Sequence, residues 1–109
     1  MRKAEIRIHD MTAGWLTQDD WGYHFIYDER YLQLASAVPV SLTLPLQSGT
    51  FTDKVLFSFF DGLIPEGWLL DIAEKNWKLN PRDRMGLLLA CCKDCIGAVS
   101  VHPVKEGNL

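Results

Sequence analysis

The sequence has little cysteine and no long apolar run. All three cysteines among its 109 residues lie in "CCKDC", residues 91–95. An odd, clustered count does not match the disulfide framework of a secreted protein. No apolar stretch approaches the roughly 18 residues that a membrane-spanning helix needs, and the start "MRK" continues into strand-like sequence rather than an apolar signal segment. The sequence therefore predicts a cytoplasmic protein without membrane contact.

The cysteines and histidines lack the grouping that a metal site requires. Cys92 and Cys95 have the spacing of a metal or redox pair, but zinc needs four ligands, usually from a second Cys or His pair. The three histidines stand alone in the sequence: His9, His24 and His102. The thiols also fall at the expected end of a helix, where the helix dipole does not favour a reactive thiolate. We interpret them as buried core residues and expect no metal and no cofactor.

Catalytic motifs and clustered positive charge are also missing. None of the patterns GxGxxG, GxxxxGK[ST], GxSxG and HExxH occurs. The acid pairs Asp19–Asp20 and Asp28–Glu29 lie in expected turns, where carboxylates are usually solvated, and His24 fits a strand face better than a general base. The net charge is −3 with scattered basic residues, whereas nucleic-acid binders usually cluster theirs. We expect neither an enzyme nor a direct nucleic-acid binder.

Apolar and aromatic residues dominate what is present. Hydrophobic residues make up 48% of the chain, which contains four Trp, five Phe and three Tyr, and this is enough apolar area for one stable domain. Residues 4–8, 15–17 and 21–28 have the alternation and aromatic content of strands, with Gly22 as a candidate bulge. They predict an antiparallel meander at the N-terminal end.

The middle of the chain is less regular. Residues 29–37 are compatible with no more than a helical turn. In residues 38–47 an aliphatic residue recurs at every second position, and its members include Val40, Leu42, Leu44 and Leu46. Two prolines in this stretch remove ladder donors, so it predicts an edge strand or an extended arm. Residues 48–54 are expected to be loop.

The second half of the chain changes to the helical period. Residues 55–62 predict a short helix that Gly62 ends. Residues 65–77 predict a second helix, because Pro65 and Glu66 both suit its first turn.

A third helix and a final strand complete the expected fold. Asn80 is the predicted cap of the third helix, with Asp83 in its first turn, and residues 95–103 predict a strand that ends at its proline. The fold class is therefore α+β: a mostly antiparallel sheet, made of the N-terminal meander and a C-terminal strand, with two or three helices in the second half. One domain is expected over residues 1–103, followed by a polar tail over residues 104–109.

Trp68 is the main candidate for a binding residue. In the helix predicted over residues 65–77, the apolar stripe is centred about 120° from Trp68, which is grouped instead with Asp71 and Lys75. Trp77 lies nearer the stripe. An exposed tryptophan is a liability unless a partner covers it, and tryptophan is enriched at interface hot spots. Helical geometry alone is equally compatible with an exposed Trp68 and with a partly buried Trp68 that packs over the start of the helix.

Three motifs resemble, in order, the N-terminal subdomain of HipA-type serine/threonine kinases. They are "PVSLTLPL" (residues 39–46), "FFDGLIPEGW" (residues 59–68) and "DCIGAV" (residues 94–99). In that family a stretch similar to PxSLSLPL precedes FF(D/E)xLLPE, and a (R/K)DCVGA strand closes the subdomain. The resemblance covers residues 3–103. The kinase core of the family does not follow: its nucleotide-binding lysine, catalytic loop and magnesium-binding acid have no counterpart here.

A free-standing copy of this subdomain resembles the HipS antitoxins of three-component HipBST systems. The resemblance implies that the chain binds a HipA-like kinase toxin of the HipT type, at the place of the fused subdomain, and keeps the kinase inactive. It also implies a complex that contains a helix-turn-helix, HipB-like protein. Inhibition would come either from Trp68 inserted near the nucleotide- or phosphate-binding loop or from restraint of the kinase lobes. The predicted partner-binding residues are Ile64, Pro65, Glu66, Gly67, Trp68 and Asp71.

Other interpretations stay open. The chain is alternatively a structural, activating subunit that completes a split HipA-like kinase. It is also compatible with a piece of a full-length HipA-like chain, although the natural-looking start and the polar tail argue mildly against that. A thiol enzyme is a distant further alternative.

Overall fold

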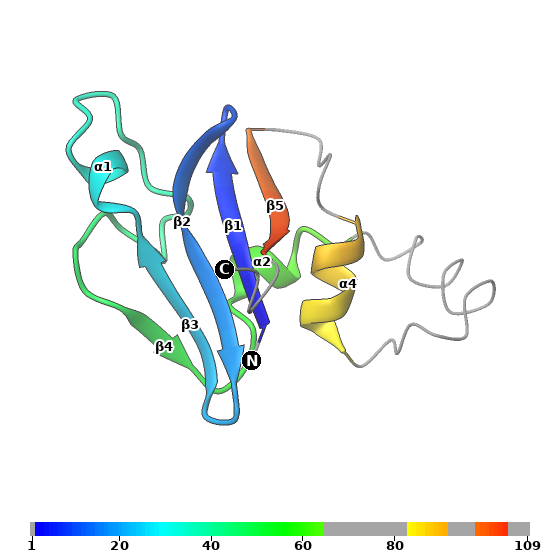
Figure 1. Cartoon of the computed structure of the whole chain (residues 1–109). Helices are drawn as coiled ribbons and strands as arrows, with labels where there is room; N and C mark the ends of the chain where they lie inside the picture. Colours follow the sequence, from blue (N-terminus) through cyan, green and yellow to red (C-terminus); the bar gives the residue numbers. More distant parts are fainter. Residues whose placement is uncertain (1, 65–82, 92–97, 105–109) are drawn as a thin grey trace.

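A computed structural model of the chain describes residues 2–64, 83–91 and 98–104. Within them, five strands form one antiparallel sheet in the order β4-β3-β2-β1-β5 (Figure 1). The strands are β1 (Arg2–Ile8), β2 (Met11–Asp19), β3 (Gly22–Tyr27), β4 (Phe51–Asp53) and β5 (Val99–Val104). The described helices are α1 (Glu29–Leu32), α2 (Ser58–Asp61) and α4 (Arg84–Cys91). The predicted α+β class, with an antiparallel meander and a C-terminal strand, is confirmed.

The β1–β2 hairpin closes with a tight turn. His9 and Asp10 have φ angles of 50° and 65°, the left-handed conformations of a two-residue hairpin turn. The pairing of the two strands shifts register between Ile6 and Arg7. The bulge of the meander therefore lies here, and the prediction that placed it at Gly22 is wrong.

Gly22 instead begins β3 at the β2–β3 turn, where it pairs with Asp19. Its φ is 138°, a conformation that other residues rarely adopt. A Cβ at this position would lie 2.4 Å from the carbonyl oxygen of Asp53. Backbone conformation and the close approach of β4 therefore both require glycine.

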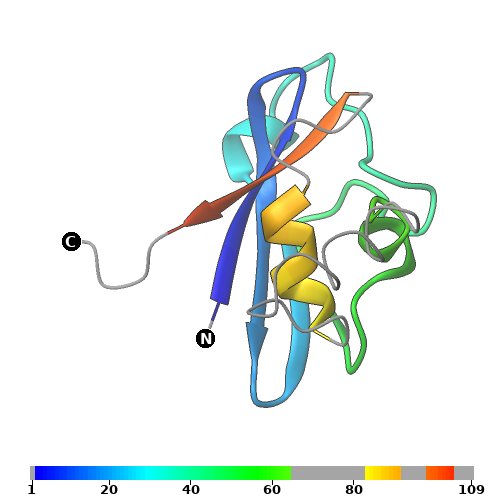
Figure 2. The same ribbon diagram turned by 90° about the vertical axis from the view of Figure 1, so that its right-hand side faces the viewer.

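Alternate side chains of β1 build the core on one face of the sheet. Ala4, Ile6 and Ile8 are buried, whereas the charged residues between them point to the opposite face because strand side chains alternate. In Figure 2, α2 and α4 lie on the same side of the sheet. Phe60 of α2 and Leu88 of α4 are fully buried in the common core. The helices therefore cover the apolar face that β1 presents.

A turn over residues 41–44 interrupts the stretch that was predicted to be an edge strand or an extended arm. Ser41 and Leu44 make an isolated bridge, in which the Leu44 amide donates to the Ser41 carbonyl oxygen over 3.1 Å. Val40 and Leu44 are buried, but Leu42 and Leu46 are exposed. The turn therefore places the members of the alternating stretch in different environments.

The strands at the two edges also differ from expectation. The expected loop over residues 48–54 contains β4, whose Phe51 pairs with Phe25 of β3. The proline predicted to end the last strand lies inside β5, where Pro103 pairs with Ala4. β5 is an edge strand of the sheet, the position where a missing N–H donor is tolerated.

The described helices are shorter than predicted. The helix expected over residues 55–62 is α2, which does end with Gly62 as its C-cap. α4 begins later than expected, because the Asp83 carbonyl oxygen accepts from Leu87 N at 3.0 Å and its carboxylate accepts from Gly86 N at 3.2 Å. Asp83 is therefore the cap of α4 and not a residue of its first turn.

Two further predictions fall outside the described residues: the cap at Asn80 and the helix over residues 65–77. None of the helices in the described segments is long and apolar enough to span a membrane.

Candidate partner-binding surfaces

Only one of the six predicted partner-binding residues is described by the structure. Ile64 is 4% exposed and belongs to the hydrophobic core. The remaining five, like Trp77 and the pair Cys92 and Cys95, lie outside the described residues: Pro65, Glu66, Gly67, Trp68 and Asp71. The partner-binding segment therefore leaves the described structure from a buried residue, and its contacts stay a prediction.

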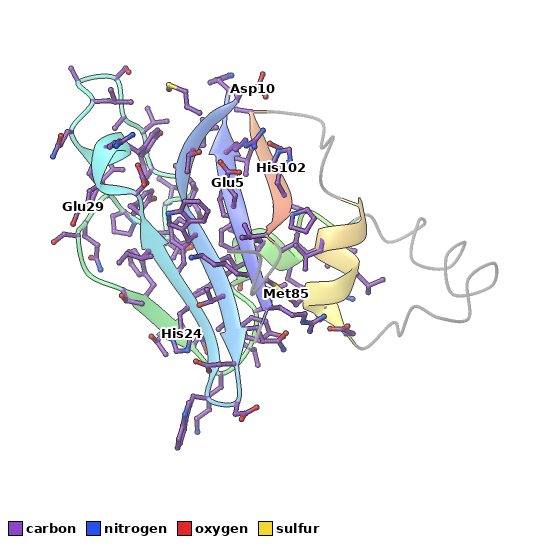
Figure 3. The ribbon with its side chains drawn as sticks, in the orientation of Figure 1. Glu5, Asp10, His24, Glu29, Met85 and His102 are labelled. Carbon is purple, nitrogen blue, oxygen red and sulfur yellow. The ribbon has the colours of Figure 1, made fainter. Side chains whose placement is uncertain are left out.

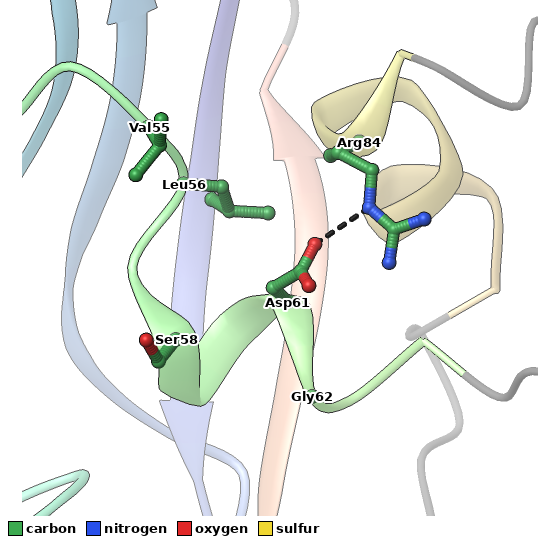
Figure 4. A pocket seen from close by; sticks show the side chains of 6 residues that line it. All are labelled: Val55, Leu56, Ser58, Asp61, Gly62 and Arg84. Carbon is green, nitrogen blue, oxygen red and sulfur yellow. Dashed lines mark hydrogen bonds and ion pairs between the residues drawn. The ribbon is translucent and has the colours of Figure 1, made fainter.

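An ion pair joins the two elements that flank this segment. Arg84 at the start of α4 donates from Nε to Oδ1 of Asp61 at the end of α2, over 2.6 Å (Figure 4). Beside the pair lies an open cavity of about 500 Å³, lined by Val55, Leu56, Ser58, Asp61, Gly62 and Arg84. Because the pair is partly exposed, it adds little to stability. It does connect the end of α2 with the start of α4, the described elements that precede and follow residues 65–82.

A second ion pair fixes the N-terminus of α4 to the sheet. Arg2 donates from Nη1 to Oδ2 of Asp83 over 2.8 Å and from Nη2 to Oδ1 over 2.6 Å. Nε of Arg2 also donates to Gln18 over 2.9 Å. The hydrogen bonds from Arg2 lower the pKa of Asp83, so that its carboxylate stays charged as cap and partner. The first strand therefore positions α4.

One carboxylate of each acid pair of the sequence has structural partners. Asp19 accepts hydrogen bonds from the backbone of Trp21 and Gly22 and contacts Nε2 of His24 over 3.0 Å. The contact with His24 is the main cause of the lowered pKa of Asp19. Asp28 caps α1, accepting from the Tyr31 amide. These carboxylates stabilise turns and a helix end.

One cluster on the open face of the sheet resembles a catalytic arrangement. Ser100 Oγ lies 2.8 Å from Nε2 of His102, and Glu5 projects from the neighbouring strand (Figure 3). The Glu5 carboxylate, however, accepts from Arg7 over 2.9 Å and from Thr12, and the bond from Arg7 is the main cause of its lowered pKa. The orienting group of a Ser-His-acid triad is thus bonded elsewhere.

Metal ligands are not grouped in the part of the chain that the structure describes. No three of its His, Cys, Asp and Glu residues come close enough to hold a metal ion.

Sequence reasoning missed the most exposed large hydrophobic side chain of the described residues. Leu42 is 96% exposed in the turn over residues 41–44. Its position in an alternating aliphatic stretch favoured burial with Val40 and Leu44. The one sequence signal that indicates a binding surface here is the absence of charge, because no Asp, Glu, Lys or Arg occurs between Arg30 and Asp53.

The described residues form a small α+β domain in which one ion pair joins α4 to α2 and another joins the N-terminal cap of α4 to β1. These described residues contain no catalytic centre. The sequence model of the HipA N-terminal domain matches residues 4–102. The chain therefore belongs to the HipA N-terminal domain family, which relates it to HipA toxin–antitoxin systems. This domain is not the catalytic domain of the kinase.

Relatives place the domain both alone and inside a longer chain. A Haemophilus influenzae protein described as uncharacterized is 28% identical over 106 residues, covering 97% of this chain and 96% of that protein. The putative kinase Y4mE of Sinorhizobium fredii is 28% identical over 95 residues, covering 86% of this chain but only 23% of the kinase. The solved N-terminal domain of HipA toxin has the same fold, with a TM-score of 0.77 at 24% identity over 97% of this chain and 95% of that one.

Proposed function

We propose that the chain is an antitoxin of the HipS type, which binds a HipT-type kinase toxin and keeps it inactive by protein–protein contact. The observation that carries this proposal is the extent of the family match. The HipA N-terminal domain accounts for residues 4–102 of the chain, whereas the matched region is 23% of the putative kinase. A domain of this kind acts on a kinase by occupying a place beside the catalytic core.

The proposed complex is cytoplasmic and also contains a helix-turn-helix, HipB-like protein, which would make the contact with DNA. The net charge of −3 agrees with this division of labour, because the chain carries no surplus of positive charge for phosphate contacts. Inhibition uses the segment that begins at Ile64, either by insertion of Trp68 near the phosphate-binding loop of the kinase or by restraint of its lobes.

A second candidate function is an activating subunit that completes a split HipA-like kinase. The observation that favours it is the match to the putative kinase Y4mE, in which the equivalent region belongs to the same chain as the rest of the protein. Both functions place the domain on a kinase. They differ in the sign of the effect on kinase activity.

Co-expression separates the two functions. A HipT-type kinase expressed alone is expected to arrest growth, and co-expression of this chain is expected to restore colony numbers and to suppress phosphorylation by the kinase. The physical reason is that a domain bound beside the catalytic core holds the kinase in an inactive complex. Deeper growth arrest together with higher kinase activity would identify the chain as the activating subunit instead.

Replacement of Trp68 tests the predicted contact. Trp68→Ala is expected to melt close to the wild type yet to lose about 2 kcal/mol of binding to the kinase, roughly a 30-fold loss of affinity, because it removes an interface anchor and not a core residue. Calorimetric titration and thermal melting measure the two quantities. Trp77→Ala is the control and is expected mainly to destabilise the fold. An unfolded Trp68→Ala protein would show a core residue, and full neutralisation by a folded one would place the interface elsewhere.

A further inference from the structure

The turn over residues 41–44, called here the Leu42 turn, holds an aliphatic side chain out of the domain. The flanking residues Val40 and Leu44 are buried, and Leu42 at the apex is 96% exposed. The Tyr27 hydroxyl bonds to both sides of the turn, accepting from the Val40 amide over 2.9 Å and donating to the Leu44 carbonyl oxygen. Leu42 therefore extends from a fixed backbone and not from a loose loop.

The sequence on both sides of the Leu42 turn is uncharged. From residue 31 to residue 52 the chain has no charged side chain, although charged residues make up 23% of the whole. Three further large aliphatic side chains are exposed in the same stretch: Leu34, Val38 and Leu46. Depletion of charge around exposed apolar side chains is the composition of an interface core and not of an ordinary solvated loop.

A groove connects the Leu42 turn with the start of α2. The groove has a volume of about 240 Å³ and is lined by Thr43, Leu44, Phe51, Asp53, Phe57 and Ser58, of which Asp53 is charged. Ser58 also lines the cavity between α2 and α4 in Figure 4, and α2 leads to Ile64. A partner that contacts the Leu42 turn is therefore able to reach α2, the element that leads to Ile64.

The size of a stable interface calls for such a second contact. Stable protein–protein interfaces bury about 800 Å² and roughly 20–30 residues on each side. The predicted contact over residues 64–71 is much smaller than that. Additional surface must come from other exposed residues, and the Leu42 turn offers an apolar surface that the groove connects with α2.

We propose that the Leu42 turn is a second docking surface, which inserts Leu42 into an apolar, uncharged depression on the same kinase partner. The inference rests on the proposed function, since it assigns the occupant of this surface to the kinase chain. It adds a contact that lies before α2 in the sequence. A rigid turn favours such docking because little conformational freedom is lost on binding.

The test measures the affinity of the purified chain for a purified HipT-type kinase by calorimetric titration. Leu42→Ala is expected to raise the Kd about tenfold, since it removes most of one buried aliphatic side chain, with an unchanged melting curve. Leu42→Met is expected to retain wild-type affinity. Trp21→Ala is the matched control: Trp21 is 84% exposed at the β2–β3 turn, but it lies between acidic and glycine residues, and its loss is expected to leave the Kd unchanged.

The outcomes are distinct. If the wild-type chain binds the kinase and Leu42→Ala binds it with the same affinity, this inference is overturned and the proposed function is not. Equal losses from Leu42→Ala and Trp21→Ala would also overturn it, because the effect would not be specific to the turn. No binding by the wild type would refute the proposed function and the inference together. A wild-type dimer in sedimentation that Leu42→Ala dissociates would assign the surface to a second copy of the chain, against the kinase.

Discussion

Phe25→Ala is expected to lower the free energy of unfolding by about 3–5 kcal/mol, the largest effect of any single replacement considered for this domain. Phe25 is fully buried on β3, between β2 and the edge strand β4. Its ring centroid lies 4.9 Å from that of Tyr27, 5.6 Å from that of Phe60 and 6.3 Å from that of Phe51. The ring therefore joins β3, β4 and α2, and its removal leaves a cavity that rigid neighbouring strands cannot close. Urea denaturation followed by circular dichroism measures the loss.

The neighbouring position on β3 provides the control. Ile26 follows Phe25 but points to the opposite, uncovered face and is exposed. Ile26→Ala is therefore expected to change the free energy of unfolding by less than about 1 kcal/mol. Equal losses at the two positions would mean that the sheet face carrying Ile26 is also covered, contrary to the arrangement in Figure 2.

The regular part of this fold was predictable because its signals are local. The alternation of residues 4–8 and the aromatic stretch over residues 21–28 predict strands from neighbouring residues alone. Gly62 ends α2 as predicted, since a helix end depends on one or two positions. The order of the motifs predicted the HipA N-terminal domain family, which the match over residues 4–102 confirms.

Features that depend on contacts between distant residues could not be predicted in this way. The Arg2–Asp83 pair joins residues 81 positions apart, and nothing in the local pattern around either residue indicates the other. The same holds for the Leu42 turn, where alternation predicts an extended segment. Its shape comes from the hydroxyl of Tyr27, 13 residues before Val40. Local periodicity does not predict a hydrogen bond between residues this far apart in the sequence.

The candidate binding residues differ in the same way, because Trp68 has a local sequence signal and Leu42 does not. Trp68 was selected by helical geometry and by residue type, both of which are local, and its partner contact stays a prediction. Leu42 carries no such signal, because a leucine between two buried aliphatic residues is usually buried as well. Only the fold shows that the chain reverses at this point and exposes the side chain. The longest uncharged part of the chain then becomes evidence for a binding surface.

Tyr27→Phe is expected to destabilise the domain by about 2–3 kcal/mol, because it leaves the buried Val40 amide and Leu44 carbonyl group without their shared partner. Phenylalanine preserves the ring packing, so the loss reports the hydroxyl. Burial raises the pKa of Tyr27 above its ordinary value of 10.0, and the hydroxyl therefore remains a donor throughout the neutral range. Denaturant unfolding of the two proteins measures the difference.

The same replacement is expected to weaken binding to the kinase, since the backbone that presents Leu42 is no longer fixed. Tyr31→Phe is the matched control: the Tyr31 hydroxyl donates to the Val38 carbonyl oxygen over 2.7 Å and accepts from the Val38 amide over 3.0 Å, outside the Leu42 turn. It is expected to destabilise the domain comparably but to preserve more of the affinity. Unchanged stability of Tyr27→Phe would mean that the turn holds its shape without the hydroxyl. Equal affinity losses in the two variants would mean that kinase binding follows overall stability and not the orientation of Leu42.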